Sequence, residues 1–135
     1  MHDFLKRYDA SLQLLIEDEF PDRRCIGGKY SVSNHTITLY KKDIEIQVKR
    51  LLGSLERLEE YVWIIFAHEM GHALDPDLSM LSMELVGPSK RETLYQIELN
   101  AWNIAGELIP FIDQGLFSRV RDESLSYCTK DVLVG

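Results

Sequence analysis

The sequence predicts a mostly helical α+β domain with a small sheet of two or three strands beside one buried helix. Apolar residues recur at helical spacing through most of the chain, whereas residues 29–32 and 36–40 alternate polar and apolar side chains as short strands do. An apolar run over residues 61–67 leads into His68, and a helix that is apolar on nearly every side is a buried one. The small sheet is therefore expected to pack beside a central helix.

Size and composition bound the function. The 135 residues, 45% of them hydrophobic, predict a single domain over residues 1–135. The formal net charge of −7 disfavours direct nucleic-acid binding, which requires clustered Lys and Arg. The first residues lack the apolar segment of a signal peptide, and no apolar run approaches membrane-spanning length. We therefore expect no membrane partner. Because Cys25 and Cys128 lie far apart and suit a reducing compartment, we also expect a cytoplasmic protein.

The N-terminal third predicts one helix and one hairpin. Residues 3–19 place apolar side chains on one helical face, and a proline two residues later would end that helix. Gly27 and Gly28 mark a turn, after which residues 29–32 and 36–40 form the two strands of a short hairpin.

Two helices are expected next. Residues 43–52 fit either a strand or a helix, and the apolar positions 44, 48, 51 and 52 favour a helix. Ser54 is a candidate N-cap for the following helix, which should run through His72 and end near Asp75 and Pro76.

The C-terminal half predicts a connector and two more helices. Residues 76–88 form a short apolar connector. Ser89 is expected to cap a helix that ends at about Leu108, with Glu92 placed to complete a capping box. Residues 113–131 predict a final amphipathic helix.

Three residues on the central helix point to metal chemistry. Residues four apart lie on one face of an α-helix, so His68 and His72 can bind the same metal ion. Glu69 lies beside them, where its carboxylate can take a proton from a metal-activated water. The alternative is two core histidines bonded to backbone carbonyls beside a salt-bridged glutamate.

A hydrolytic zinc site needs a third protein ligand and keeps a fourth position for water. The other histidines, His2 and His35, lie upstream, and the position six residues after His72 is Leu78. Glu98 on the predicted 89–108 helix is the better candidate, although an ordinary salt-bridging glutamate fits that position equally well.

Residues 67–74 and 98–110 together resemble the ImmA/IrrE-type metallopeptidases of the glutamate-zincin group. In that family a metal-binding helix is followed by a helix in which Glu precedes Ala by three residues, before a leucine-rich turn and a proline. The resemblance covers roughly residues 30–110. It implies a zincin-like fold that contains the metal-binding helix and a strand at residues 36–40.

The resemblance also implies the site and the activity. It assigns His68, His72 and Glu98 as ligands of Zn²⁺, with Mn²⁺ as the alternative ion, and Glu69 as the general base of a metalloendopeptidase. The substrate would lie extended along the edge of the 36–40 strand. Members of this family often cleave a repressor with a helix-turn-helix domain, so the resemblance implies a regulatory protease with a protein or peptide substrate.

One position departs from the family pattern. Trp102 stands where the family usually has Asn or Asp, a side chain that can orient a ligand histidine. Asn100 and Asn103 are candidates to replace it. Tyr95, one turn before Glu98, is a candidate oxyanion donor, with a core or surface tyrosine as the other interpretation.

Two other functions fit parts of the pattern. A deformylase-type hydrolase would use an upstream cysteine as third ligand, and Cys25 is the candidate, but the glycine-rich and cysteine-centred motifs of that family are not found in this sequence. A catalytically weak or inactive metal-binding module that regulates a protein partner through the same groove is the second alternative. Trp102 favours that module, and the presence of Glu69 argues against it.

Overall fold

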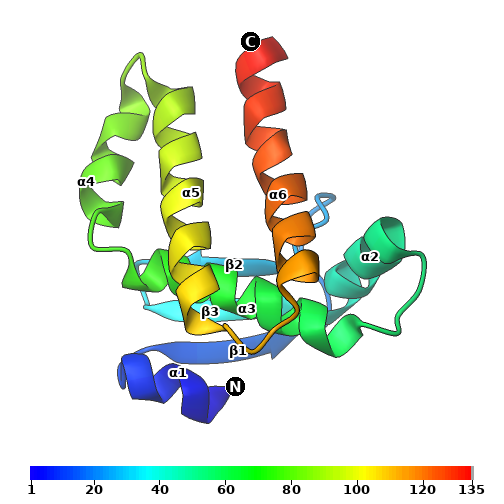
Figure 1. The fold of residues 1–135 in the computed structure, drawn as a ribbon. Helices are drawn as coiled ribbons and strands as arrows, with labels where there is room; N and C mark the ends of the chain where they lie inside the picture. The colour runs from blue at the N-terminus through cyan, green and yellow to red at the C-terminus, as the bar shows by residue number, and fades with distance from the viewer. Residues whose placement is uncertain (135) are drawn as a thin grey trace.

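The computed structural model describes the backbone of residues 1–134 and the side chains of residues 1–128. It has the predicted α+β class, with six α-helices, one 3-10 helix and a small sheet in this part of the chain (Figure 1). The elements are α1 (His2–Tyr8), β1 (Gln13–Glu17), β2 (Gly28–Ser31), β3 (Thr36–Tyr40), α2 (Lys41–Leu52), α3 (Leu58–Leu74), α4 (Leu78–Met83), the 3-10 helix η1 (Glu84–Val86), α5 (Lys90–Leu108) and α6 (Gln114–Val134).

The sheet has three strands in the order β1-β3-β2. The predicted hairpin is confirmed, because β2 pairs antiparallel with β3, and β1 adds to the other side of β3 in parallel. All five side chains of β3 are buried. The expectation that a substrate lies along the edge of the 36–40 strand is wrong, because β3 is central and its backbone is paired on both sides. Within the described chain, β1 and β2 are the edge strands.

The predicted helix over residues 3–19 is also wrong beyond Tyr8. The carboxylate of Asp9 accepts hydrogen bonds from the backbone N–H of Ser11 at 2.9 Å and from its hydroxyl at 2.6 Å, which turns the chain away from the helix. Leu12 and Leu14 then point into the core while Gln13 between them is exposed. This alternation is that of a strand.

The central helix α3 packs against one side of the sheet, and its buried residues include Ile64, Phe66 and Met70, none of which has exposed surface (Figure 1). It ends at Leu74 as predicted, but it starts at Leu58 with Arg57 as the N-cap residue, so the expected cap at Ser54 is wrong. The Arg57 guanidinium pairs with Glu60 at 3.0 Å and with Asp113 at 2.9 Å, which fixes the start of α3 to the start of α6.

The remaining helices complete the fold. Residues 43–52 are helical, as favoured, within α2. The expected connector contains α4 and η1. The helix predicted from Ser89 is α5, although the Ser89 side chain makes no capping hydrogen bond and no capping box forms. The last predicted helix is α6, and α5 packs against both α6 and α3 (Figure 1).

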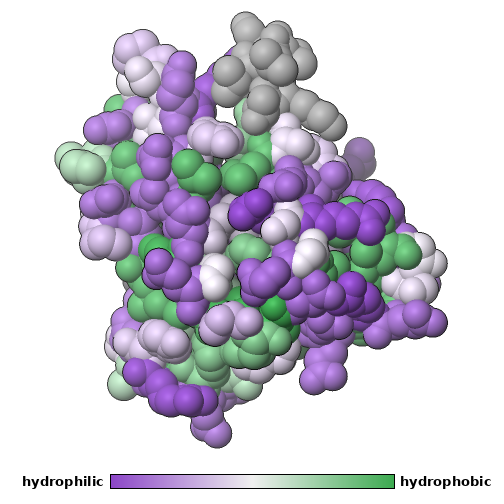
Figure 2. All heavy atoms as spheres, in the orientation of Figure 1, coloured by the Kyte–Doolittle hydropathy of each residue, from purple (hydrophilic) through white to green (hydrophobic). Residues whose placement is uncertain are grey.

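On the face drawn in Figure 2, hydrophobic side chains form several separate patches among hydrophilic ones. None of the helices in the described part of the chain combines the length and the hydrophobicity needed to cross a bilayer.

Candidate metal centre

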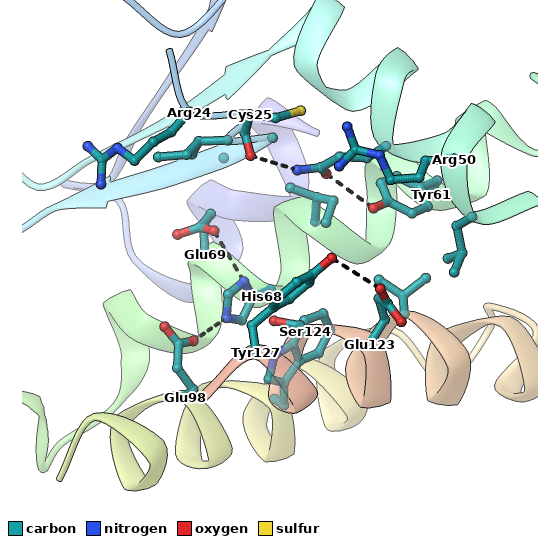
Figure 3. A pocket seen from close by; sticks show the side chains of 18 residues that line it. Arg24, Cys25, Arg50, Tyr61, His68, Glu69, Glu98, Glu123, Ser124 and Tyr127 are labelled. Atoms are coloured by element: carbon teal, nitrogen blue, oxygen red, sulfur yellow. Dashed lines mark hydrogen bonds and ion pairs between the residues drawn. The ribbon is translucent and has the colours of Figure 1, made fainter. Parts of the chain in front are cut away.

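The structure brings the three predicted ligands together. His68 and His72 are one turn apart on α3, with ring centroids 4.8 Å apart, and α5 carries Glu98 to meet them. One carboxylate oxygen of Glu98, Oε2, lies 2.8 Å from His68 Nε2 and 3.2 Å from His72 Nε2 (Figure 3 shows the contact with His68). The side chains of both histidines are almost buried, with 12% and 13% of their surface exposed.

The separations of Glu98 Oε2 from the two histidine nitrogens fit a zinc ion, and the ligand atoms of all three residues lie within 4.8 Å of one another. Tetrahedral zinc with bonds of about 2.0–2.1 Å separates its ligand atoms by roughly 3.3 Å. The two contacts of Glu98 Oε2, at 2.8 and 3.2 Å, need to open by only a few tenths of an ångström. Two imidazole nitrogens and one carboxylate oxygen are also a donor set that leaves the fourth position open, as catalytic zinc requires.

A glycine between the two histidines, Gly71, makes this meeting possible. A Cβ atom built at Gly71 would overlap the backbone carbonyl oxygen of Ala101 and would lie 2.8 Å from its carbonyl carbon. The helices α3 and α5 therefore approach so closely at this point that a side chain does not fit. Ala101 on α5 and Gly71 on α3 are the two sides of this contact, and the sequence alone did not predict the role of Gly71.

Glu69 lies on the strand side of His68. Its carboxyl group is buried, and Oε2 is 3.2 Å from His68 Nδ1 (Figure 3). The strand β2 passes over it, because a Cβ at Gly28 would lie 3.0 Å from Glu69 Cγ and 2.9 Å from Ile65 Cγ2. The edge strand next to the candidate base is therefore β2.

The charged forms of His68 and Glu98 stabilise each other. Burial lowers the pKa of His68, but the carboxylates of Glu69 and Glu98 outweigh it and raise that pKa to about 10. Burial in turn favours the neutral form of Glu98, whereas hydrogen bonds from His68 and His72 hold its pKa well below the usual range. A divalent cation bound at His68 Nε2 would take the place of the imidazole proton, so the site is one where metal binding releases protons.

A cavity of about 660 Å³ opens beside His68, Glu69 and Glu98. Figure 3 shows Arg24 and Cys25, in the segment before β2, on one side of the cavity and Glu123, Ser124 and Tyr127 of α6 on the other. The cavity reaches along α3 to Tyr61, two helical turns before His68, so it extends about 10 Å from the candidate metal position. Aliphatic and aromatic side chains make up part of its lining, which includes Ile26, Leu51, Ile65, Trp102 and Val120.

Polar contacts hold the far end of the cavity together. The Tyr61 hydroxyl donates to Gln47 Oε1 at 3.1 Å, and Gln47 Nε2 donates to the carbonyl oxygen of Cys25 at 3.3 Å. Burial raises the pKa of Tyr61 to about 12, so this hydroxyl remains a hydrogen-bond donor at neutral pH.

Other candidate residues have different partners. The Cys25 thiol lines the cavity but lies 3.5 Å from the carbonyl oxygen of Asp43, and burial raises its pKa, which disfavours a thiolate ligand. Tyr95 is not among the described residues that line the cavity, so the structure does not support it as the oxyanion donor. Asn100 contacts Asp75 at 3.4 Å, and Asn103 is exposed, so neither takes the orienting role considered for it.

Trp102 is the residue whose place sequence reasoning missed. It is buried beside the site, and its indole stacks on the His68 imidazole with centroids 4.3 Å apart and an interplanar angle of 10°. Two signals in the sequence marked this position: it lies one turn after Glu98, and the resembled family has a side chain there that can orient a ligand histidine.

Comparisons of the chain with protein-family models, curated proteins and solved structures found no match. The resemblance to ImmA/IrrE-type metallopeptidases therefore stays a prediction from the quoted motifs.

Proposed function

We propose that the protein is a zinc-dependent metallopeptidase that cleaves a protein substrate, with His68, His72 and Glu98 as metal ligands and Glu69 as general base. One observation carries the proposal: two Nε2 atoms from one helix and a carboxylate oxygen from another, thirty residues along the chain, converge within hydrogen-bond distance beside a large cavity. Two core histidines bonded to backbone carbonyls beside a salt-bridged glutamate, the alternative interpretation, do not require such a cavity.

In the proposed mechanism the metal ion is the Lewis acid and Glu69 is the general base. Zinc bound here supplies a Lewis acid and lowers the pKa of the attacking water. Glu69 takes the proton from that water and delivers it to the leaving amine. Burial of the Glu69 carboxyl group, which is 6% exposed, limits its competing contacts with solvent.

The substrate is proposed to lie along the free edge of β2. Three features support this strand over β3: its outer edge is unpaired in the described chain, Gly28 contacts Glu69, and Gly28 lines the cavity. An extended peptide can add to such an edge through backbone hydrogen bonds, which favours a peptide over a small molecule.

The remaining parts of the proposal concern the metal ion, the protein substrate and the location. Two imidazole ligands favour Zn²⁺ and leave Mn²⁺ as the alternative ion. A repressor with a helix-turn-helix domain is proposed as the protein substrate on the resemblance alone. A cytoplasmic location is proposed because Cys25 and Cys128 lie far apart in the sequence, a cysteine usage that suits a reducing compartment.

The test is hydrolysis of a mixed peptide library by the zinc-loaded chain and by Glu69→Gln. We expect the variant to keep about one zinc per chain and to lose activity by roughly 10²–10⁴-fold, the usual contribution of a general base. Glu107→Gln is the matched control, because it makes the same change at an exposed position on α5 and should leave activity unchanged. Full activity in Glu69→Gln would refute its assignment as base.

One observation favours a second function, a metal-binding regulatory module without catalysis. Glu69 Oε2 lies 3.2 Å from His68 Nδ1, and a carboxylate held there would orient the ligand histidine instead of acting as a base. In that case Glu69→Gln would weaken zinc binding, and the unmodified chain would bind a partner without cleaving it.

A further inference from the structure

Trp102 is one turn after Glu98 on α5 and fills the space between three helices. Its side chain is 1% exposed. One face of the indole stacks on His68 of α3 at 4.3 Å, and the ring of Phe117 from α6 meets it at 5.6 Å with an interplanar angle of 72°. The indole therefore links the metal-binding helix to the two helices that pack beyond it.

We propose that Trp102 is a positioning residue for the metal ligand His68. Its indole fixes the plane of the imidazole and so directs Nε2 toward Glu98 Oε2 and the ion. This is the role that a hydrogen bond to the second ring nitrogen usually plays in zinc sites. The inference rests on the proposed metal site and adds a determinant of metal affinity to it.

The geometry of the imidazole explains why a flat surface is needed. The terminal torsion of histidine has a broad, shallow minimum, so the ring plane must be set by its neighbours. A rotation of about 30° moves Nε2 by roughly 0.3 Å, which exceeds the ±0.2 Å tolerance of a zinc bond. The nearly parallel indole, inclined by 10° to the imidazole, blocks that rotation on one face.

Hydrogen bonding alone does not orient the ring in this site. The partner of His68 Nδ1 is Glu69, at 3.2 Å, and the proposed mechanism requires Glu69 to transfer protons. A carboxylate that moves protons is a poor fixed anchor, whereas the indole keeps its contact with His68 through such a step.

The burial of the indole nitrogen also supports a positioning role for Trp102. Trp102 Nε1 is buried and has no hydrogen-bond partner in the described part of the chain. A buried donor without an acceptor destabilises the fold, so packing alone would be served better by a side chain without that N–H group. What the indole adds over phenylalanine or leucine is a larger flat surface against His68.

The experiment measures zinc affinity by competition with a chromophoric chelator for three variants. Trp102→Leu keeps an apolar side chain but removes the flat surface, and we expect zinc affinity to fall about tenfold or more. Trp102→Phe keeps an aromatic surface, and we expect a loss of less than about threefold. Phe117→Leu is the matched control, because Phe117 contacts the same indole edge-on without stacking on His68, and its loss should leave zinc affinity unchanged.

A spectroscopic measurement covers the case in which Trp102→Leu does not fold. In a Trp63→Phe background Trp102 is the remaining tryptophan, and its emission should change as zinc binds, with the same Kd as chelator competition gives. Emission that does not change at saturating zinc would overturn the proposal.

The outcomes separate this inference from the proposed function. Wild-type affinity in Trp102→Leu, or an equal loss in Phe117→Leu, overturns the positioning role and leaves the zinc site intact. Failure of the unmodified chain to bind zinc overturns both.

Discussion

Gly71→Ala should weaken the fold and the metal site together. The new Cβ would lie 2.8 Å from the carbonyl carbon of Ala101 and 2.9 Å from its Cα. Carbon atoms in contact are normally about 3.5–4.0 Å apart, so the two backbones must separate by roughly 0.7–1.2 Å. Neither contact is with a flexible side chain that could turn away.

The expected change in the free energy of unfolding is the sum of two opposing effects. Overpacking of this kind costs about 1–3 kcal/mol, and alanine in place of glycine inside a helix returns about 1 kcal/mol. Because the obstacle is backbone, we expect a net loss of about 1–2 kcal/mol, which lowers Tm by roughly 3–10 °C. The separation also carries Glu98 away from the histidines by more than a zinc bond tolerates, so zinc affinity should fall at least tenfold, an order-of-magnitude expectation.

The assay combines thermal unfolding of the metal-free chain with a zinc titration. Gly106→Ala is the control on α5, because its Cβ would meet the Phe117 ring at an ordinary distance of 3.5 Å. That variant should keep its zinc affinity and gain up to about 1 kcal/mol in stability. If Gly71→Ala is as stable as the unmodified chain and binds zinc equally well, the close approach of α3 and α5 is not what assembles the site.

Two further predictions concern β2 and the N-terminal turn. Gly28→Ala places a Cβ 3.0 Å from Glu69 Cγ, so it should displace the Glu69 carboxylate and lower kcat about tenfold. The zinc content should stay at that of the unmodified chain. An unchanged kcat would argue against β2 as the strand that passes over Glu69. Hydrogen bonds from Ser11 and then from His35 lower the pKa of Asp9 to about 2 from 3.8, so Asp9 stabilises the fold above pH 4 or so and this contribution is lost as the pH falls toward 2. Acid unfolding of Asp9→Asn should therefore depend less steeply on pH over that range, and an identical pH dependence would contradict the assigned hydrogen bonds.

The sequence predicted the features that depend on local spacing. The histidines four residues apart need only one helix to face one ion, and that helix ends near Pro76 as expected. The hairpin of β2 and β3 was also predictable, because glycines and alternating residues mark it directly.

The errors arose where tertiary contacts decide between two patterns. In residues 3–19 the apolar positions fit a helix, and the turn at Asp9 together with pairing to β3 makes the second half a strand. The error over residues 3–19 also caused the error about the substrate. Without β1 in the predicted sheet, the 36–40 strand had a free edge along which a substrate could lie. The start of α3 was missed for a similar reason, because Arg57 pairs with Asp113 from the far end of the sequence.

The stacking of Trp102 on His68 could not be predicted from either segment. It depends on the close packing of α3 and α5 at Gly71, which brings a residue of one helix onto the ring of another. A sequence pattern that describes each helix separately contains no such information.

Zinc content tests the central claim most directly. The measurement is zinc per chain after purification without added metal or a His-tag, for the unmodified protein, for Glu98→Ala and for Glu92→Ala as an exposed control on the same helix. The three-ligand site predicts about one zinc per chain in the unmodified protein and in Glu92→Ala, and much less in Glu98→Ala. No zinc in the unmodified chain after zinc is supplied, or equal zinc in Glu98→Ala, would contradict it.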